Sequence, residues 1–308
     1  MTKLYIFTGF LGSGKTTLLQ ELMRKLDGHR IGVIQNEFGK LSIDGEILKR
    51  DGIQMLEINR GSIFCTCLKL HFVEALAQMA AMDFEYLFVE SSGIGDPSNV
   101  EEILHVVRET KGGEFDFAGM ICLVDAVNFP DQLDDEEAVN RQLKHSHLAV
   151  ISKTDLVSPE RINRVVDLIR GINPVCRIEI ATNGDLDPSF LNDDLMQYQW
   201  AGNEPSTNSV DTVPKALMML PGEPFKRENF ERFVAVLAPK MHRLKGFVEL
   251  ENEGWYQIDV VGEIVDYKPC EAKDKPHLVV ISKIGPQIIR PLVNEWKDKV
   301  KTKLELKN

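Results

Sequence analysis

Residues 9–17 read GFLGSGKTT and match a phosphate-binding P-loop, in which a glycine, four further residues and a Gly-Lys-Thr run follow one another. Glycines let the backbone N–H groups of such a loop turn inward around an anion, and the helix that follows adds the positive end of its dipole. Lys15 would reach the β- and γ-phosphates, and the Thr16 hydroxyl would bind Mg²⁺. We therefore predict a nucleoside triphosphate site that includes Gly9, Gly12, Ser13, Gly14, Lys15, Thr16 and Thr17.

A second polar run, Ser152-Lys-Thr-Asp155, follows an apolar strand where GTPases carry N-K-x-D to read guanine. The Asp155 carboxylate would accept from two guanine N–H groups, and the stem of Lys153 would cover the ring. Adenine offers no matching pair of donors and would leave the carboxylate unpaired. Ser152 replaces the usual Asn, and Ala181, after the next strand, is a candidate contact for the base edge. A polar surface turn is the alternative interpretation.

The run Glu90-Ser-Ser-Gly93 follows another apolar strand. Glu90 could hold Mg²⁺ directly or through water, and the Gly93 N–H could meet the γ-phosphate. We expect Lys15, Glu90 and Gly93 to act in hydrolysis, although an acid at a strand end can be purely structural. No Gln follows Gly93 to orient water, so turnover without a partner or metal should be slow.

The elements that must position these residues alternate along residues 1–200. We expect strands at 3–8, 30–35, 54–58, 86–90, 117–124, 148–152 and 177–181, with helices at 17–26, 68–82, 99–108, 136–144 and 159–172. This alternation predicts an α/β fold of the P-loop NTPase type, with a mostly parallel sheet and helices on both faces. The P-loop domain is assigned to residues 1–200.

The polar stretch 201–214 lacks periodicity and is the predicted linker. Beyond it the order of elements changes. We expect a strand at 216–220, a helix at 227–241, strands at 244–250, 255–261, 263–267 and 277–282, and a final helix at 287–303 whose basic residues face solvent. Residues 215–308 therefore predict a smaller α+β domain.

Taken together, these motifs identify a resemblance. GFLGSGKTT, NEFG at 36–39, a Cys-containing segment after Asn59, ESSGIGDP at 90–97, SKTD and HRLKGFV at 242–248 occur in one order. The set resembles the CobW-type branch of the CobW/HypB/UreG GTPases over nearly the whole chain. The resemblance implies GTP hydrolysis coupled to delivery of a transition metal, often zinc or cobalt, to a client metalloprotein or a cofactor-carrying protein.

The metal-binding segment departs from that family, which usually shows C-x-C-C. Ser62 and Phe64 occupy two of the three cysteine positions, and Cys67 is additional. Two thiolates, an imidazole and a carboxylate could still bind Zn²⁺ or Co²⁺; the candidates are Cys65, Cys67, His71 and Glu37. The alternative is that these cysteines only pack as small apolar side chains.

The remaining histidines and cysteines predict packing rather than chemistry. His145 and His147 have His-x-His spacing but fall at a helix end, and Cys122, Cys176 and Cys270 lie in or beside expected strands. Five cysteines in 308 residues do not indicate a disulfide framework.

Composition limits the partners. With 36 Lys and Arg against 47 Asp and Glu, the net charge of −11 argues against nucleic-acid or anionic-membrane binding. No signal peptide or membrane span is expected, so a cytoplasmic location is predicted. A homodimer is compatible with these features.

Two other functions stay open at this point. A P-loop kinase or ATP-using activase would fit the altered SKTD and the missing cysteines. A nucleotide-gated protein adaptor without metal handling would fit the same departures.

Overall fold

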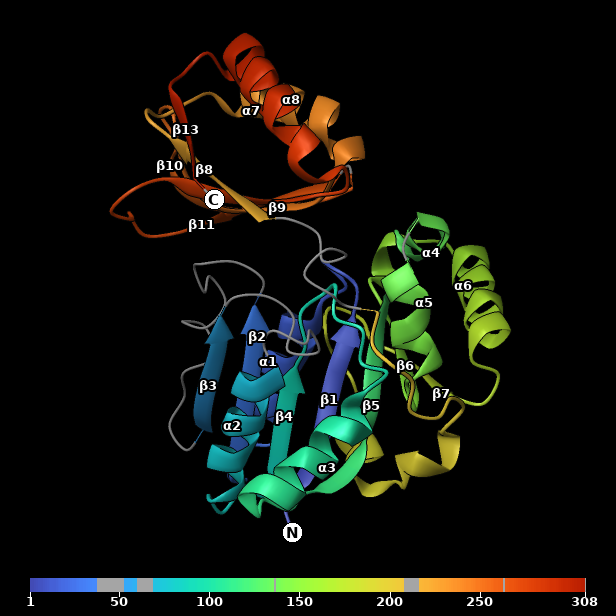
Figure 1. Ribbon diagram of the computed structural model, residues 1–308. Coiled ribbons are helices and arrows are strands. Elements are labelled where there is room, and N and C mark those ends of the chain that lie inside the picture. Colours follow the sequence, from blue (N-terminus) through green and yellow to red (C-terminus); the bar gives the residue numbers. More distant parts are fainter. Residues whose placement is uncertain (38–52, 60–68, 136, 208–215, 263, 308) are drawn as a thin grey trace. The chain divides into compact units, whose positions relative to one another are not determined.

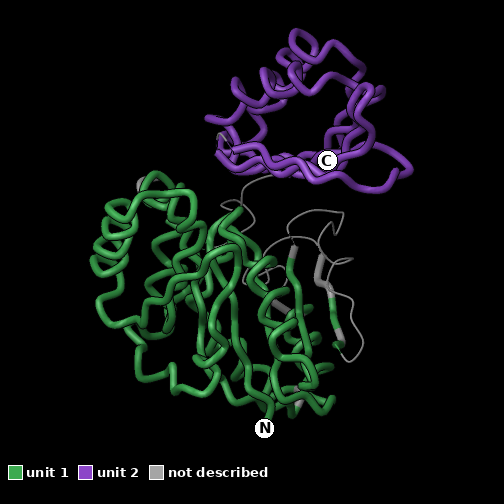
Figure 2. Tube along the Cα trace, turned by 180° about the vertical axis from the view of Figure 1, so that it is seen from behind, with its two compact units in different colours: residues 1–213 green, residues 214–308 purple. Residues whose placement is uncertain are grey.

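The computed structural model describes residues 1–37, 53–59, 69–135, 137–207, 216–262 and 264–307. The chain divides into two compact units, Met1–Val213 and Pro214–Asn308 (Figure 2). The predicted limits of 1–200, 201–214 and 215–308 rest on composition and stay a prediction.

In the described part of the first unit, seven strands pair in parallel in the order β3-β2-β4-β1-β5-β6-β7 (Figure 1). They are β1 (Lys3–Gly9), β2 (Ile31–Glu37), β3 (Ile53–Asn59), β4 (Tyr86–Glu90), β5 (Asp116–Asp125), β6 (Leu148–Ser152) and β7 (Arg177–Ile180). The helices are α1 (Lys15–Lys25), α2 (Lys69–Ala80), α3 (Val100–Lys111), α4 (Phe129–Asp135), α5 (Glu137–Lys144) and α6 (Pro159–Ile172), with 3-10 turns η1 (Thr154–Leu156), η2 (Pro188–Asn192) and η3 (Leu195–Tyr198).

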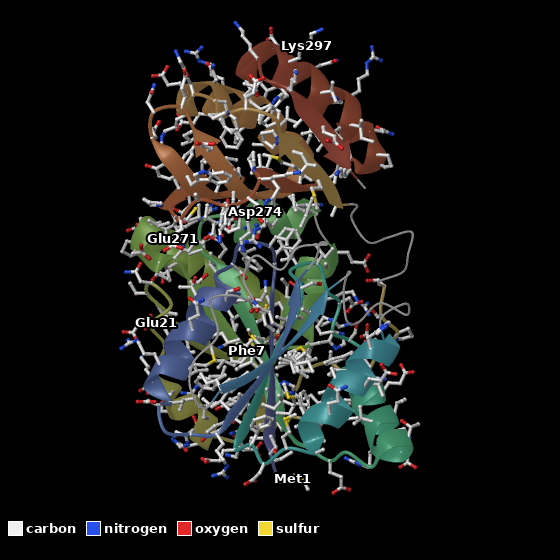
Figure 3. All side chains as sticks on the ribbon, turned by 90° about the vertical axis from the view of Figure 1, so that its left-hand side faces the viewer. Met1, Phe7, Glu21, Glu271, Asp274 and Lys297 are labelled. Atoms are coloured by element: carbon white, nitrogen blue, oxygen red, sulfur yellow. The ribbon has the colours of Figure 1, made fainter. Side chains whose placement is uncertain are left out.

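Alternation along β1 gives this sheet two buried faces, because successive side chains of a strand point to opposite sides. Tyr5 and Phe7 join the core that contains Leu18 and Leu22 of α1, together with η2 and η3. Leu4 and Ile6 join the opposite core, which α2 and α3 cover. Phe7 lies among the side chains at the centre of the unit (Figure 3). The predicted α/β fold with helices on both faces is confirmed.

The carboxyl ends of the central strands bring the predicted chemistry to one edge. Phe7 of β1 is opposite Glu90 of β4, and Asp125 of β5 is opposite Ser152 of β6. Ligands of open α/β sheets bind at this edge. The P-loop leaves β1 there.

In the described part of the second unit, six strands pair antiparallel in the order β11-β10-β9-β12-β8-β13. They are β8 (Ala216–Pro221), β9 (Met241–Leu250), β10 (Gly254–Val261), β11 (Ile264–Pro269), β12 (His277–Ser282) and β13 (Leu304–Lys307). Helices α7 (Arg227–Leu237) and α8 (Ile289–Glu295) lie on one side of this sheet (Figure 1). Trp296 is at the centre of their core, with its ring 5.2 Å from Phe225 and 5.1 Å from Phe233. The smaller α+β domain is confirmed.

Many predicted element ends differ from the structure by one to three residues, and three differences are larger. The helix expected over 227–241 ends at Leu237, because Pro239 cannot continue it, and Met241 already begins β9. A separate helix, α4, precedes α5 and was not predicted. The expected final helix is wrong at its end: Lys301 is left-handed at φ 65°, and residues 304–307 pair with β8 as strand β13.

None of the described helices is long and apolar enough to cross a membrane.

Candidate functional site

The P-loop joins β1 to α1, and its shape depends on glycine. Gly14 has a left-handed φ of 94° at the N-terminus of α1. A Cβ on Gly9 would lie 2.5 Å from the Leu123 carbonyl oxygen of β5, so a larger residue would push the loop off the sheet. The Lys15 ammonium is turned back onto the loop and donates to the carbonyls of Gly9 (2.6 Å) and Phe10 (3.1 Å). This lysine therefore lies inside the loop, where bound phosphates would replace the carbonyls as its partners.

Thr16 and Glu90 lie together at the end of the loop. The Thr16 hydroxyl donates to Glu90 Oε1 at 2.7 Å, and Gln35 Nε2 of β2 donates to Glu90 Oε2 at 3.1 Å. Glu90 is only 5% exposed. A threonine hydroxyl beside a carboxylate supplies the hard oxygen ligands that Mg²⁺ prefers, so these residues fit that ion.

The segment after Glu90 packs directly on the P-loop. A Cβ on Gly93 would lie 2.7 Å from the backbone nitrogen of Leu11 and 2.8 Å from its Cα. Gln142 Nε2 of α5 donates to the carbonyls of Gly93 (3.3 Å) and Gly95 (2.8 Å), which holds the segment from its other side. Gly93 is thus in backbone contact with the phosphate-binding loop.

The SKTD run lies beside the same loop. Ser152 Oγ donates to the Ser13 carbonyl at 2.7 Å, so the residue that replaces Asn still bonds to the P-loop. Lys153 is left-handed at φ 56°, and Asp155 lies exposed in η1.

The predicted base-edge loop lies next to that run. Ala181 is buried, and its N–H donates to the Ile151 carbonyl of β6 at 2.9 Å. The hydroxyls of Thr154 and Thr182 lie 3.3 Å apart. A Cβ on Gly184 would lie 3.0 Å from Thr17 Cγ2, so this loop also approaches the exposed Thr17 at the start of α1.

Sequence reasoning missed Asp96, which gathers several donors within the buried segment. Its carboxylate accepts from Arg141 Nε (2.7 Å), the Thr207 N–H (2.6 Å) and hydroxyl (2.9 Å), and the Ser98 N–H (3.1 Å) and hydroxyl. Burial alone would raise the pKa of Asp96, but the hydrogen bonds from Ser98 and Thr207 outweigh it and hold the pKa below its usual value. The only signal in the sequence was its place in ESSGIGDP.

Residues 204–207 are anchored by the same cluster. The Glu204 N–H donates to the Ser98 carbonyl at 3.0 Å, and its carboxylate pairs with Lys144 and, at 3.2 Å, with Arg141. Ser206 Oγ donates to the Asp96 carbonyl at 3.2 Å. The end of the first unit is therefore bonded to the segment that follows Gly93.

The structure leaves the predicted transition-metal site untested, because the side chain of only one of its four candidate ligands is described. Cys65 and Cys67 lie outside the described residues, as does the Glu37 side chain at the end of β2. His71 is exposed near the start of α2. Among the described residues, no group of three or more His, Cys, Asp or Glu is placed to hold a metal ion. This metal site stays a prediction.

The two histidines and three cysteines that were expected to pack are buried or half-buried. His147, between α5 and β6, accepts from the Met120 N–H at 3.0 Å, and burial lowers its pKa to about 4. Burial also lowers the pKa of His145, which follows α5 directly. The thiol pKa is raised by burial to about 12 in Cys122 and about 11 in Cys176, while Cys270 is half-buried.

Comparisons with known proteins agree with these motifs. Residues 3–178 match the family described as CobW/HypB/UreG, nucleotide-binding domain, and residues 216–295 match the cobalamin synthesis protein CobW C-terminal domain. The two matched regions fall one in each unit.

Individual relatives cover different shares of the chain. The zinc chaperone YjiA of Escherichia coli is 28% identical over 215 residues, which are 68% of this chain and 65%, just under two thirds, of that protein. The zinc-regulated GTPase metalloprotein activator 1 of Schizosaccharomyces pombe is 24% identical over 335 residues, covering 92% of this chain and 80% of the relative. The crystal structure of Zn(II)-bound YjiA GTPase from E. coli covers 97% of this chain and 98% of its own, with 21% identity and a TM-score of 0.47.

Proposed function

Because the chain belongs to the CobW/HypB/UreG family, we propose that it hydrolyses GTP as a switch that delivers a transition metal to a client protein. The observation that carries this proposal is the hydrogen bond between Thr16 and Glu90, 2.7 Å long, at the end of the P-loop. It pairs a loop hydroxyl with a buried carboxylate from a neighbouring strand. The resident cofactors in this proposal are GTP and Mg²⁺.

The residues at the carboxyl ends of the central strands each take a role in this proposal. Lys15 leaves the carbonyls of Gly9 and Phe10 and binds the β- and γ-phosphates. Thr16 and Glu90 would hold Mg²⁺, which would neutralise charge on the phosphates. The Gly93 N–H, in the segment packed against Leu11, bonds to the γ-phosphate and loses this partner on hydrolysis.

Guanine selection is assigned to Asp155. It is exposed beside the loop that contains Ala181 and can therefore reach a base held next to the P-loop. Ser152 supports the site by its bond to the Ser13 carbonyl. A carboxylate in this position accepts hydrogen bonds from the two N–H donors of guanine. Adenine has no matching pair of donors and would leave the carboxylate unpaired.

The cargo in this proposal is Zn²⁺ or Co²⁺, bound by Cys65, Cys67, His71 and Glu37. The support is the names of two relatives, a zinc chaperone and a zinc-regulated GTPase metalloprotein activator, together with the ligand chemistry of the four residue types. We place this activity in the cytoplasm with a metalloprotein as the client.

Residues 204–207 supply a route from the nucleotide to the second unit. They bond to Asp96 and Ser98, three and five residues beyond Gly93, and they precede the second unit in the chain. A change in the 90–97 segment on hydrolysis would therefore alter the partners of the strand of chain that leads to Pro214.

Equilibrium binding of GDP and ADP tests the nucleotide part of the proposal. The chain should bind GDP at least about tenfold more tightly, and Asp155→Asn should erase the difference. Asp187→Asn, which alters an exposed carboxylate at the start of η2, is the matched control and should leave the preference for GDP over ADP unchanged. Equal affinity for GDP and ADP in the unaltered chain would contradict guanine selection.

Anaerobic titration of Zn²⁺ and Co²⁺ into the GTP-bound chain tests the metal part. Metal binding should change the rate of GTP hydrolysis. Cys65→Ser and Cys67→Ser should each weaken metal binding. No bound metal in any nucleotide state, with hydrolysis unchanged in Cys65→Ser, would instead support a nucleotide-gated adaptor.

A further inference from the structure

A buried carboxylate that no motif explains lies next to the guanine-reading run. Asp125 is the last residue of β5, and its side chain is 1% exposed. Its Oδ2 pairs with the Lys153 ammonium at 2.7 Å. Lys153 is the residue whose stem is expected to cover the base, so this ion pair fixes the far end of that stem.

The Asp125 carboxylate is itself held in place. Its Oδ1 accepts from the N–H groups of Val127 (2.9 Å) and Asn128 (3.3 Å), and its Oδ2 accepts from Asn128 Nδ2 at 2.9 Å. Its backbone pairs with Ser152, which bonds to the P-loop. The carboxylate is therefore a fixed anchor, and the longer lysine side chain is the member of the pair that is positioned.

Lys153 lies in a turn, where its side chain needs a partner in order to be held in one orientation. Its left-handed φ of 56° turns the chain from β6 into η1, where Asp155 lies. A lysine in a turn would otherwise sample many rotamers in solvent, and ordering it when the base binds would cost side-chain entropy. Pairing with a buried acid orders the stem before any nucleotide arrives.

We propose that Asp125 is a positioning residue for guanine binding: its buried carboxylate holds Lys153 across the base site and so raises affinity for the base. This inference rests on the guanine selection proposed above. Asp125 does not touch the nucleotide in this account; it acts through Lys153.

A purely structural role for Asp125, capping the turn at Val127 and Asn128, is the competing explanation. In Asp125→Asn the amide oxygen can still accept from both N–H groups, but the NH₂ group that replaces Oδ2 loses the Lys153 ion pair and the bond from Asn128 Nδ2. Pyrophosphate as a base-free ligand and the Lys153→Met background therefore separate the two explanations. Lys153→Met keeps an apolar stem and removes the ammonium. Asp131→Asn, an exposed carboxylate of α4, is the matched control.

The test is a double-mutant cycle on GDP affinity, with pyrophosphate as a base-free competitor. Asp125→Asn should weaken GDP binding about tenfold and leave pyrophosphate binding unchanged. In the Lys153→Met background, adding Asp125→Asn should cause no further loss. Additive losses, or an equal loss for pyrophosphate, would overturn the proposal.

A second variant keeps the test decisive if Asp125→Asn does not fold. Lys153→Arg retains a cation for Asp125 and should bind GDP more tightly than Lys153→Met, which should lose about tenfold. Full affinity in Lys153→Met would refute the inference. Failure of the proposed function looks different: the unaltered chain would then bind GDP and ADP equally.

Discussion

At the scale of single residues, the candidate site consists of polar groups that already have partners. Glu90 receives one hydrogen bond from the P-loop and one from β2, and Lys15 is satisfied by two loop carbonyls. In the proposed function these groups already lie where a triphosphate and Mg²⁺ would bind, and only their partners would change on binding. Because these side chains are already ordered in the folded chain, ligand binding does not have to supply the entropy cost of ordering them.

Glu90→Gln tests the metal role at this scale. The amide can still accept from Thr16, but it removes the negative charge that attracts Mg²⁺. We expect GTP hydrolysis to fall roughly 10- to 100-fold, with more Mg²⁺ needed for half-maximal rate. A rate measured across a Mg²⁺ series checks this. Glu85→Gln, just before the start of the same strand and paired with exposed His29, should change neither quantity.

His147 predicts a pH dependence of stability. Its pKa falls from an ordinary 6.5 to about 4 on burial, so the folded chain binds this proton less readily than the unfolded chain does. The contribution of neutral His147 to the free energy of unfolding is fully present above pH 6.5 and is lost as the pH falls toward 4. The total loss is about 3 kcal/mol.

His147→Asn provides the comparison, because its side-chain oxygen can accept from the Met120 N–H without titrating. The free energy of unfolding, measured by denaturant from pH 7 to pH 4, should fall more steeply in the unaltered chain. If the free energy of unfolding falls with pH equally in the two proteins, His147 is not the source of the pH dependence.

Residue types and local spacing could predict only part of this site. Gly9 to Thr17, Glu90 and Asp155 each belong to a short run with its own chemistry. Asp125 and Gln35 belong to no such run, and their roles follow from strands that lie side by side in the fold. Nothing in the sequence near Asp125 indicates that Lys153, 28 residues later, is its partner.

At the scale of elements, the segment after β4 and the P-loop form one packed layer. Gly93 touches the backbone of Leu11, and Gln142 of α5 holds the segment in that position. Backbone atoms cannot move aside as a flexible side chain can. The distance between the P-loop and the segment after β4 is therefore set by the absence of a side chain at residue 93.

Gly93→Ala should disturb this layer. We expect a loss of about 1 to 3 kcal/mol of stability and weaker GTP binding, because the added methyl meets Leu11 backbone atoms at 2.7 and 2.8 Å. Thermal unfolding and nucleotide titration measure both effects. Gly171→Ala in α6 is the control: a Cβ there meets nothing within 4 Å, so stability should rise by about 0.5 to 1 kcal/mol.

Periodicity predicted the class of both sheets, and it was wrong where short elements depend on tertiary contacts. Strand β13 has four residues, LELK, within a basic tail that favours helix, and it forms because Leu304 and Leu306 lie opposite Pro221 and Met219 of β8. The division between α4 and α5 likewise has no strong local signal.

At the scale of the whole molecule, hydrogen bonds join the segment after Gly93 to residues 204–207, the last residues of the first unit that the structure describes. Asp96 and Thr207 are 111 residues apart in sequence and share two hydrogen bonds. Arg141 joins the same cluster through Asp96 and Glu204. No sequence pattern predicts these contacts, which join the segment after Gly93 to residues 204–207 of the same unit.

Amide hydrogen exchange at Thr207 tests the proposed route from the nucleotide to these contacts. Its N–H donates to Asp96 at 2.6 Å and should exchange more slowly with a non-hydrolysable GTP analogue bound than with GDP. Arg141→Gln should remove that difference. The Gly222 amide, bonded to Lys303 within the second unit, serves as internal reference and should not respond. Equal protection of Thr207 in both nucleotide states would contradict the route.

The central claim is that this edge of the sheet hydrolyses GTP with Mg²⁺ and discriminates against ATP. The direct measurement is single-turnover phosphate release from GTP and from ATP at equal concentrations, with and without Mg²⁺. The account predicts slow release from GTP that requires Mg²⁺ and is at least about tenfold faster than release from ATP. Equal rates for the two nucleotides, or release from GTP that is indifferent to Mg²⁺, would contradict it.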